Sequence, residues 1–257
     1  RRHWYTLFLF SSLLLFSWKT DGLEGCAKQK PPAEVQEASV SMEETEKTPE
    51  YTLQAASPPP ASEAASLFPD NFRNVLFIGD SRTVGLSEYG PLGDADVFAD
   101  NGMTVFNLWE RKLLFDSSQQ KTLEQILKEN QYQAVHVMLG INELGYSMDQ
   151  IVKSYKKAVK NIQDMQPDAR VVLAANLHVT SECSANSSVY NNHRLNELNG
   201  EIQNTGKELN CSYINVNEIF DDESGFVKKF STDGSHVLGK YYADWAQWIQ
   251  DNYMRLP

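Results

Sequence analysis

The sequence is poor in cysteine, in basic charge and in long apolar runs, and each shortage narrows what the chain can be. Its 257 residues include three cysteines, and 34 acidic side chains outnumber 23 basic ones, for a formal net charge of -11. Binding to nucleic-acid phosphates needs clustered lysine and arginine, so this balance argues against a nucleic-acid partner. Beyond the N-terminal segment, no run is apolar enough to span a membrane.

Motifs for nucleotides and metals are also missing. The sequence has no Walker A loop, and no Gly-x-Gly-x-x-Gly follows an expected strand, which argues against nucleotide binding. The five histidines show no metal-ligand spacing, so neither a metal nor another cofactor is expected. His136 alternates within an expected strand, which indicates a packed or rim side chain. His178 lies past the end of another strand and could line a pocket.

Residues 1–26 have the composition of an export signal. Two arginines precede an apolar run over residues 4–18, which has the length of a signal h-region and is short for a membrane-spanning helix. Residues 23–26, Leu-Glu-Gly-Cys, resemble a bacterial lipobox, in which Cys26 would be lipidated. Ordinary cleavage nearby and an uncleaved anchor are the alternatives. We therefore expect an exported protein, secreted or held at the cell surface, that meets a membrane only through this segment.

Residues 27–66 form a second region, which is acidic and holds six of the ten prolines. Such a composition cannot bury enough apolar surface to offset the entropy of ordering, so a disordered, extended tether is expected. If Cys26 carries lipid, Cys183 and Cys211 remain as a candidate disulfide pair. The alternative is two unrelated buried thiols.

Residues 67–257 alternate short apolar runs with helical patterns, which is typical of βαβ units and a parallel sheet. The pattern predicts a doubly wound, three-layer α/β/α sandwich with a five-stranded parallel sheet, a flavodoxin-like arrangement, and we expect a monomer. Strands are expected at Asn74–Ile78, Asp96–Ala99, Ala134–Leu139, Arg170–Ala175 and Tyr213–Val216, and helices at Arg82–Tyr89, Gln119–Asn130, Met148–Met165, Tyr190–Leu209 and Leu238–Asn252.

The first expected strand runs into Gly79-Asp80-Ser81. A serine at a sharp turn from a strand into a helix stands at the carboxyl edge of the sheet, where ligands of such folds bind. The helix N-terminus behind it offers free N–H groups to a developing negative charge. The motif is weak alone, since these residue types also make ordinary turns and helix caps.

Asp233 stands three residues before His236, ahead of the last expected helix. One turn of chain can fold this carboxylate back onto the imidazole and fix the tautomer whose other nitrogen faces a serine. The alternative is a helix cap beside an incidental surface histidine.

Two further residues follow expected strands. Asn142 lies just past the third strand, where its amide could donate to an oxyanion. Gly102 follows the second strand, where a glycine lets a backbone N–H approach a ligand closely. A polar strand terminator and a turn glycine are the ordinary alternatives.

Together these segments resemble the SGNH hydrolase family, also called GDSL-type esterases and lipases, over residues 74–248. The family name refers to a Ser, a Gly, an Asn and a His in four blocks, and each has a counterpart here in the same order. The resemblance implies that Ser81 is the nucleophile, that His236 is the general base and that Asp233 orients the imidazole. It also implies an oxyanion hole made by the backbone N–H groups of Ser81 and Gly102 and the side chain of Asn142.

Two positions depart from the family pattern. The leucine that often follows the serine is Arg82, and the aspartate that usually follows the block-three asparagine is Glu143. We expect Arg82 to change local polarity and Glu143, one methylene longer, to rearrange the supporting hydrogen bonds. Neither change removes a catalytic group.

Export, a tether and this family together favour an esterase that removes acetyl or other short acyl groups from a carbohydrate or cell-surface glycan. An acyl-enzyme mechanism would need no cofactor. A lysophospholipase, thioesterase or acyltransferase for longer acyl chains is one alternative, and a glycan-binding module without turnover is another. A carbohydrate surface is expected from polar and aromatic residues near the site, with core packing as the alternative for the tryptophan: Asn107, Trp109, Asn176, Asn191 and Asn192.

Overall fold

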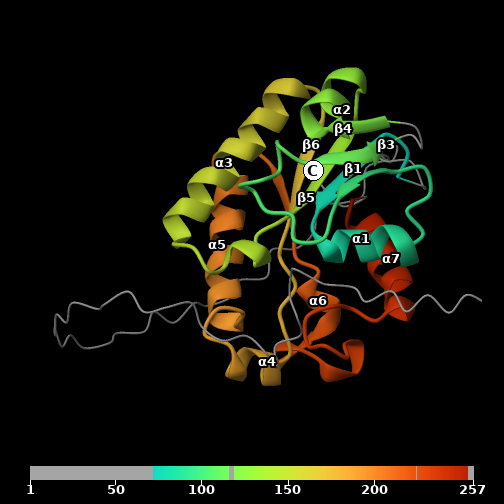
Figure 1. The fold of residues 1–257 in the computed structure, drawn as a ribbon. Helices are drawn as coiled ribbons and strands as arrows, with labels where there is room; N and C mark the ends of the chain where they lie inside the picture. Colours follow the sequence, from blue (N-terminus) through green and yellow to red (C-terminus); the bar gives the residue numbers. More distant parts are fainter. Residues whose placement is uncertain (1–71, 116–118, 224, 254–257) are drawn as a thin grey trace, which may run out of the picture.

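The computed structural model describes residues 72–115, 119–223 and 225–253. In this part of the chain, five parallel strands form one sheet in the order β2-β1-β5-β6-β7, with helices on both faces (Figure 1). The predicted three-layer sandwich with a five-stranded parallel sheet is confirmed. The strands are β1 (Val75–Gly79), β2 (Asp96–Ala99), β5 (Ala134–Met138), β6 (Arg170–Ala174) and β7 (Ser212–Ile214).

Two apolar cores lie on opposite faces of this sheet. Leu76 and Ile78 of β1 belong to the core that includes the helices α2, α3 and α5. Val75 and Phe77, which alternate with them, belong to the core that includes α1, α6 (Asn217–Phe220) and α7. A sheet buried on both faces explains why its strands are apolar runs without polar alternation. The five long helices are α1 (Ser81–Tyr89), α2 (Leu123–Glu129), α3 (Met148–Met165), α5 (Asn192–Glu208) and α7 (Tyr242–Tyr253).

Helix α3 begins and ends at the predicted residues. Ile151, Tyr155 and Val159 recur at helical spacing and are buried against the sheet. Ser147 begins the helix, since its side chain accepts the backbone N–H of Gln150. The helical spacing of the apolar residues and the N-terminal cap at Ser147 together account for this helix.

A hairpin stands where part of a helix was expected. β3 (Lys112–Phe115) pairs antiparallel with β4 (Gln119–Thr122), so the prediction of helix at residues 119–122 was wrong. Thr122 and Gln125 form a capping box, in which each side chain accepts the other residue's backbone N–H. This box begins α2 at Leu123.

Several short elements were not predicted. The last helix, α7, begins at Tyr242 and not at Leu238, because a 3-10 turn precedes it. The elements that were not predicted have too few residues to show a periodic pattern of apolar side chains. They are η1 (Ile141–Glu143), α4 (Ser181–Asn186), α6 (Asn217–Phe220), β8 (Asp221–Asp222), β9 (Gly225–Phe226), η2 (Lys228–Phe230) and η3 (Gly239–Tyr241).

The expected bridge between Cys183 and Cys211 is wrong, because Cys211 keeps a free thiol. Cys183 lies before α5 and Cys211 lies after it. Cys183 packs beside Gly234, past the carboxyl ends of the strands, whereas Cys211 immediately precedes β7 at the opposite edge of the sheet, so the two side chains do not meet.

The predictions for the N-terminal segments (an export signal in residues 1–26, lipid at Cys26 and a tether in residues 27–66) lie outside the described residues. Among the helices that the structure describes, none combines the length and the apolar character needed to cross a membrane.

Candidate active site

The turn between β1 and α1 presents Ser81 as the first residue of the helix. Asp80 caps this helix, because its Oδ1 accepts the backbone N–H of Arg82 at 2.9 Å. The turn is too sharp for a side chain at Gly79, since a Cβ there would come within 1.9 Å of Thr83 Oγ1. Ser81 is thereby held at the carboxyl edge of the sheet, at the positive end of a helix.

Asp233 organises the loop that carries the histidine (residues 231–237, the His236 loop). Its Oδ1 accepts the backbone N–H groups of Ser235 and His236, both at 2.8 Å, and the hydroxyl of Ser231 at 3.1 Å. Gly234 adopts a positive φ of 87°, which allows the tight turn around the carboxylate. The loop is therefore shaped by the same carboxyl group that contacts the imidazole.

Ser81, His236 and Asp233 form one chain of hydrogen bonds. Ser81 Oγ lies 2.9 Å from His236 Nε2, and His236 Nδ1 lies 2.6 Å from Asp233 Oδ2. Burial alone would raise the pKa of Asp233, but hydrogen bonds from the ring and backbone of His236 and from the Ser235 backbone hold that pKa well below its usual range. An ionised Asp233 keeps the proton on Nδ1, so Nε2 faces Ser81 as an acceptor.

The two other predicted residues lie on loops that leave neighbouring strands at the same level. Gly79 of β1 pairs with Ala99 of β2 on one side and with Met138 of β5 on the other. Gly102 follows β2 by three residues, in a left-handed conformation with φ of 69°. Asn142 follows β5 within η1. Ser81, Gly102 and Asn142 therefore follow the carboxyl ends of three adjacent strands and lie at the same edge of the sheet.

These two loops, the Gly102 loop (residues 100–107) and the Asn142 loop (residues 139–147), are joined by hydrogen bonds. Asn142 Nδ2 donates to the Met103 carbonyl at 3.0 Å. An amide nitrogen carries two hydrogens, so this contact still leaves one for a ligand. Glu143 adds a second link, because its Oε1 accepts the Val105 N–H at 2.6 Å.

Glu143 is fully buried, and burial raises the pKa of its carboxyl group to about 8. The group is therefore protonated at neutral pH and enters the interior without a charge. Its Oε2 has no hydrogen-bond partner among the described residues. The glutamate that replaces the usual aspartate thus spans two loops as a neutral side chain.

Arg82, which follows Ser81, is also fully buried. Its Nε donates to the Ser235 carbonyl at 3.2 Å, in the loop that carries His236. Burial lowers the pKa of Arg82 and raises that of Asp80, and the opposite charge of each opposes the shift in the other. The sequence alone indicated a change in local polarity at Arg82. The structure adds a direct tie between α1 and the His236 loop.

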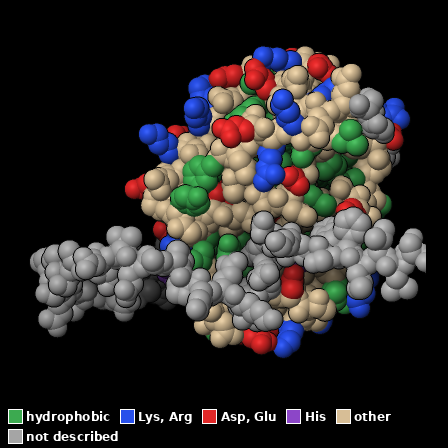
Figure 2. All heavy atoms as spheres, viewed as in Figure 1, with side chains coloured by type: hydrophobic (Ala, Val, Ile, Leu, Met, Phe, Trp, Pro, Cys, Tyr) green, Lys and Arg blue, Asp and Glu red, His purple; other side chains and the backbone are tan. Residues whose placement is uncertain are grey.

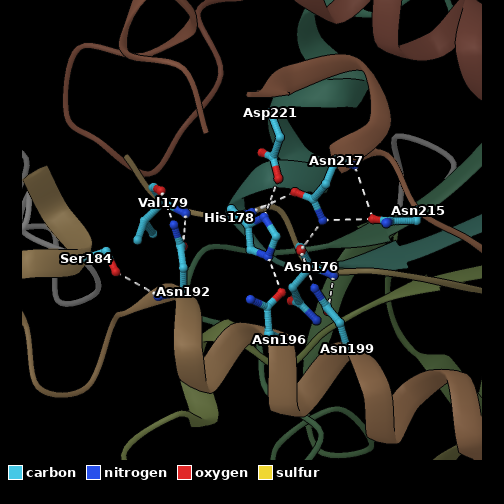
Figure 3. A network of polar contacts seen from close by, with 10 residues as sticks. All are labelled: Asn176, His178, Val179, Ser184, Asn192, Asn196, Asn199, Asn215, Asn217 and Asp221. Atoms are coloured by element: carbon cyan, nitrogen blue, oxygen red, sulfur yellow. Dashed lines mark hydrogen bonds and ion pairs between the residues drawn. The ribbon is translucent and has the colours of Figure 1, made fainter. Parts of the chain in front are cut away.

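The predicted carbohydrate surface is wrong for Asn176, which has no exposed surface. Asn199 accepts the Asn176 N–H at 2.7 Å and donates to its carbonyl at 2.9 Å, and Asn217 donates to the same carbonyl. Figure 3 shows Asn176 between these two side chains. Asn192 belongs to the same network through the backbone of Val179, so it also serves the fold.

The other three residues of that predicted surface have local partners as well. Asn107 Oδ1 accepts the Thr104 N–H at 2.9 Å within a turn. Asn191 caps α5 by accepting the N–H of Arg194. Trp109 is partly buried and packs against the core, as its alternative interpretation held.

Two histidines outside the triad have defined roles in packing. His136 is buried on β5, where its Nδ1 lies 2.7 Å from the Tyr253 hydroxyl, and burial lowers its pKa to about 3. His178 lies between Asp221, which contacts Nδ1, and Asn196, whose Oδ1 is 2.7 Å from Nε2 (Figure 3). Burial lowers the pKa of His178, but the bond to Asp221 outweighs it and leaves the pKa raised. No group of three or more His, Cys, Asp or Glu side chains in the described part of the chain could hold a metal ion.

Two exposed aromatic residues escaped the sequence-based prediction. Phe106 and Tyr146 follow Gly102 and Asn142 by four residues each, and their ring centroids lie 4.9 Å apart. Single aromatic residues in loops carry no pattern of their own. Only the spacing from the two motifs could have drawn attention to them.

Comparisons with known proteins place this geometry in a family. The model of the GDSL-like lipase/acylhydrolase family matches residues 77–243, most of the described chain. No curated protein sequence matched. A GDSL-like lipase from Bacteroides thetaiotaomicron is similar in structure, with a TM-score of 0.55 and 16% identity over 70% of this chain and 87% of that one.

Two structures of acetyl esterases are also similar. The acetyl xylan esterase AlAXEase has a TM-score of 0.52 and 15% identity, covering 69% of this chain and 98% of that one. A mutant of the acetyl-xylooligosaccharide esterase Axe2 from Geobacillus has a TM-score of 0.50 and 15% identity, covering 70% and 93%. Such low identities show a shared fold alone.

The family model covers the strands, the helices and the loops that bring Ser81, His236 and Asp233 together, and it describes lipases and acylhydrolases. The protein belongs to the GDSL-like lipase/acylhydrolase family.

Proposed function

We propose that this protein is a serine esterase that removes acetyl or other short acyl groups from a carbohydrate, with Ser81 as nucleophile. The observation that carries the proposal is the unbroken hydrogen-bonded chain from Ser81 through His236 to Asp233. Membership of an acylhydrolase family supports it, and so do two acetyl esterases of xylan or xylo-oligosaccharides among the similar structures.

In the first step, the Ser81 hydroxyl attacks the ester carbonyl while His236 Nε2 takes its proton. The carbonyl π electrons move to oxygen, and the negative charge forms beside the N-terminus of α1 and the Asn142 amide. When the tetrahedral intermediate collapses, the C–O bond to the alcohol breaks and His236 returns the proton to the leaving oxygen. The acyl group is then an ester of Ser81.

In the second step, water replaces the alcohol. His236 takes a proton from the water as its oxygen attacks the acyl carbonyl, and the second intermediate collapses with Ser81 as the leaving group. His236 then protonates Ser81 Oγ, and the carboxylic acid departs. Throughout, Asp233 keeps its charge and stabilises the imidazolium, which its low pKa allows.

Hydrolysis of p-nitrophenyl acetate tests this proposal. The wild-type protein should release nitrophenol at least about a thousandfold faster than Ser81→Ala, the usual scale for losing a nucleophile. Ser87→Ala, an exposed serine on the same helix, is the matched control and should keep full activity. A fluorescent phosphonate should label wild type and Ser87→Ala, but not Ser81→Ala. Equal rates for wild type and Ser81→Ala would refute an acyl-enzyme at this residue.

Export and lipid attachment at Cys26 are a separate part of the proposal, supported by the apolar run behind two arginines. Cys26→Ser should release or mislocalise the protein if Cys26 carries its lipid. The protein would stay with the membrane fraction if residues 4–18 act as an uncleaved anchor, and this result would reject lipidation. Cys211→Ser, at the free thiol, should not change the distribution.

A further inference from the structure

Phe106 and Tyr146 form an exposed aromatic pair beside the predicted oxyanion donors. Tyr146 is 55% exposed and Phe106 is 38% exposed, and their rings meet at an angle of 58°. Phe106 lies on the Gly102 loop and Tyr146 on the Asn142 loop, so the pair bridges these two loops on their outer side. On the face seen in Figure 2, hydrophobic side chains reach the surface below the charged side chains that crowd the region of α2 and α3.

The turn that carries Phe106 is held firmly on both sides of the ring. Thr104 and Asn107 close it with reciprocal bonds, in which each side chain accepts the other residue's backbone N–H. Val105, which precedes Phe106, is buried and donates its N–H to Glu143. The exposed ring therefore stands on an ordered turn.

The backbone of Tyr146 is fixed as firmly. Its N–H donates to the Glu143 carbonyl at 2.8 Å, and its own carbonyl accepts Arg194 Nη2 of α5 at 2.9 Å. Leu144, two residues earlier, is buried in the core. Exposed apolar rings on a well-ordered backbone are typical of binding sites. An ordered apolar surface in contact with water is unfavourable in free energy unless a ligand covers it.

We propose that the aromatic pair is a subsite that binds a sugar ring of the acylated substrate. This inference rests on the proposed function. One face of a pyranose carries C–H groups that pack on the electron-rich faces of aromatic rings, while its hydroxyls point outward toward polar groups. Asn107, which follows Phe106, and Arg194, whose Nη2 donates to the Tyr146 carbonyl, supply polar groups near the pair.

The open geometry favours a sugar over a long acyl chain. An alkyl chain gains most when apolar surface encloses it on all sides, whereas these two rings meet at a wide angle and stay about half exposed. The acyl carbonyl belongs between Ser81 and the oxyanion donors. A pair mounted four residues past those donors therefore meets the part of the substrate that extends away from the reacting bond.

Steady-state kinetics on two kinds of acetyl ester test the subsite. The probes are O-acetylated xylo-, cello- and chito-oligosaccharides and, as an ester without sugar, p-nitrophenyl acetate. For the oligosaccharide with the highest wild-type kcat/KM, Phe106→Ala with Tyr146→Ala should raise KM about fivefold to tenfold with kcat within twofold. The rate on p-nitrophenyl acetate should stay within twofold. Tyr146→Phe alone, which keeps both rings of the pair, should leave KM at the wild-type value.

Tyr89→Ala is the matched control, since Tyr89 is 59% exposed and lies at the far end of α1. This variant should change neither the KM for the oligosaccharide nor the KM for p-nitrophenyl acetate. An unchanged oligosaccharide KM in the double variant would overturn the subsite, and so would equal losses on both esters. A loss that grows from p-nitrophenyl acetate to octanoate would assign the pair to the acyl chain and also overturn it. Activity on p-nitrophenyl acetate that Ser81→Ala abolishes, with no turnover of any oligosaccharide, would refute the subsite and leave the esterase intact.

Discussion

Glu143 shows how a single buried carboxyl group links the stability of the site to pH. Its pKa is about 8 in the folded protein, because burial disfavours the charged form, and its ordinary value is 4.5. Below about pH 4.5 both the folded and the unfolded chain hold this proton. Between about 4.5 and 8 the unfolded chain loses it and the folded chain keeps it, so the free energy of unfolding falls as pH rises through this window.

Glu143→Gln should remove this part of the pH dependence. Glutamine keeps an oxygen to accept the Val105 N–H and has no charge to desolvate. Relative to wild type, the free energy of unfolding of the variant should therefore increase by up to a few kcal/mol between pH 5 and pH 8. Urea denaturation at pH 5, 6.5 and 8 measures the difference, with Glu110→Gln, at an exposed glutamate between β2 and β3, as control. Parallel curves for wild type and Glu143→Gln would contradict a protonated Glu143.

Arg82 and Asp80 flank Ser81 with opposite charges, and both are fully buried. Arg82→Leu restores the residue that often follows the serine in this family, but it leaves Asp80 buried without a nearby cation. We expect a loss of about 3 kcal/mol in the free energy of unfolding, the scale for breaking one side of a buried charge pair.

A second substitution tests whether the charge is the cause. Asp80→Asn in the Arg82→Leu background should recover part of the loss, because asparagine still caps α1 and carries no charge. Urea denaturation of the two single variants and the double variant gives the coupling energy. Arg73→Leu, which breaks an exposed ion pair with Asp94, should cost little by comparison. Strictly additive losses would show that Asp80 and Arg82 do not depend on each other.

At the scale of elements, the junction of β5 with η1 places Asn142. Gly140 has a φ of 136°, and a Cβ there would lie 2.6 Å from Leu198 Cδ2. Gly140→Ala should destabilise the protein by about 1–3 kcal/mol and lower kcat on p-nitrophenyl acetate, because relieving the clash displaces Asn142. Gly145→Ala, on the same loop with open space around it, is the control and should change neither quantity. Equal kcat for both variants would contradict the role of Gly140 in placing Asn142.

The elements that were predicted correctly share a physical cause. Strands buried on both faces are continuous apolar runs, and α3 repeats its apolar side chains at helical spacing, so the residue types alone reveal them. The β3–β4 hairpin carries no such pattern, since Gln119 and Gln120 are exposed and polar. A start signal for α2 was present in Thr122 and Gln125, but a capping box is recognised with confidence only when a break before it is known.

At the scale of the whole molecule, the features of the candidate site likewise fall into two groups. Some follow from local sequence patterns, and others arise only when the folded chain brings distant segments together. Ser81, Asp233 and His236 could be predicted because the turn, the one-turn Asp-to-His spacing and the strand ends are local features. The bond from Arg82 to Ser235 and the contact of Phe106 with Tyr146 could not, because each joins segments that only the folded chain brings together. Asparagine was misjudged for a related reason: Asn176 looks like a surface residue, yet its backbone and side chain are bonded inside the fold.

The Asn176 network joins β6 to α5 and α6 and reaches the site through the Leu139 carbonyl, which accepts Asn176 Nδ2 at 2.9 Å. Asn199→Ala would leave the buried Asn176 N–H without its partner, so we expect a loss of about 1–3 kcal/mol in the free energy of unfolding. Because Leu139 begins the Asn142 loop, kcat on p-nitrophenyl acetate should also fall in the folded variant. Urea denaturation and initial rates measure both effects, with the exposed Asn204→Ala on the same helix as control. A variant that loses stability but keeps wild-type kcat would confine the network to holding α5 and α6 against the sheet.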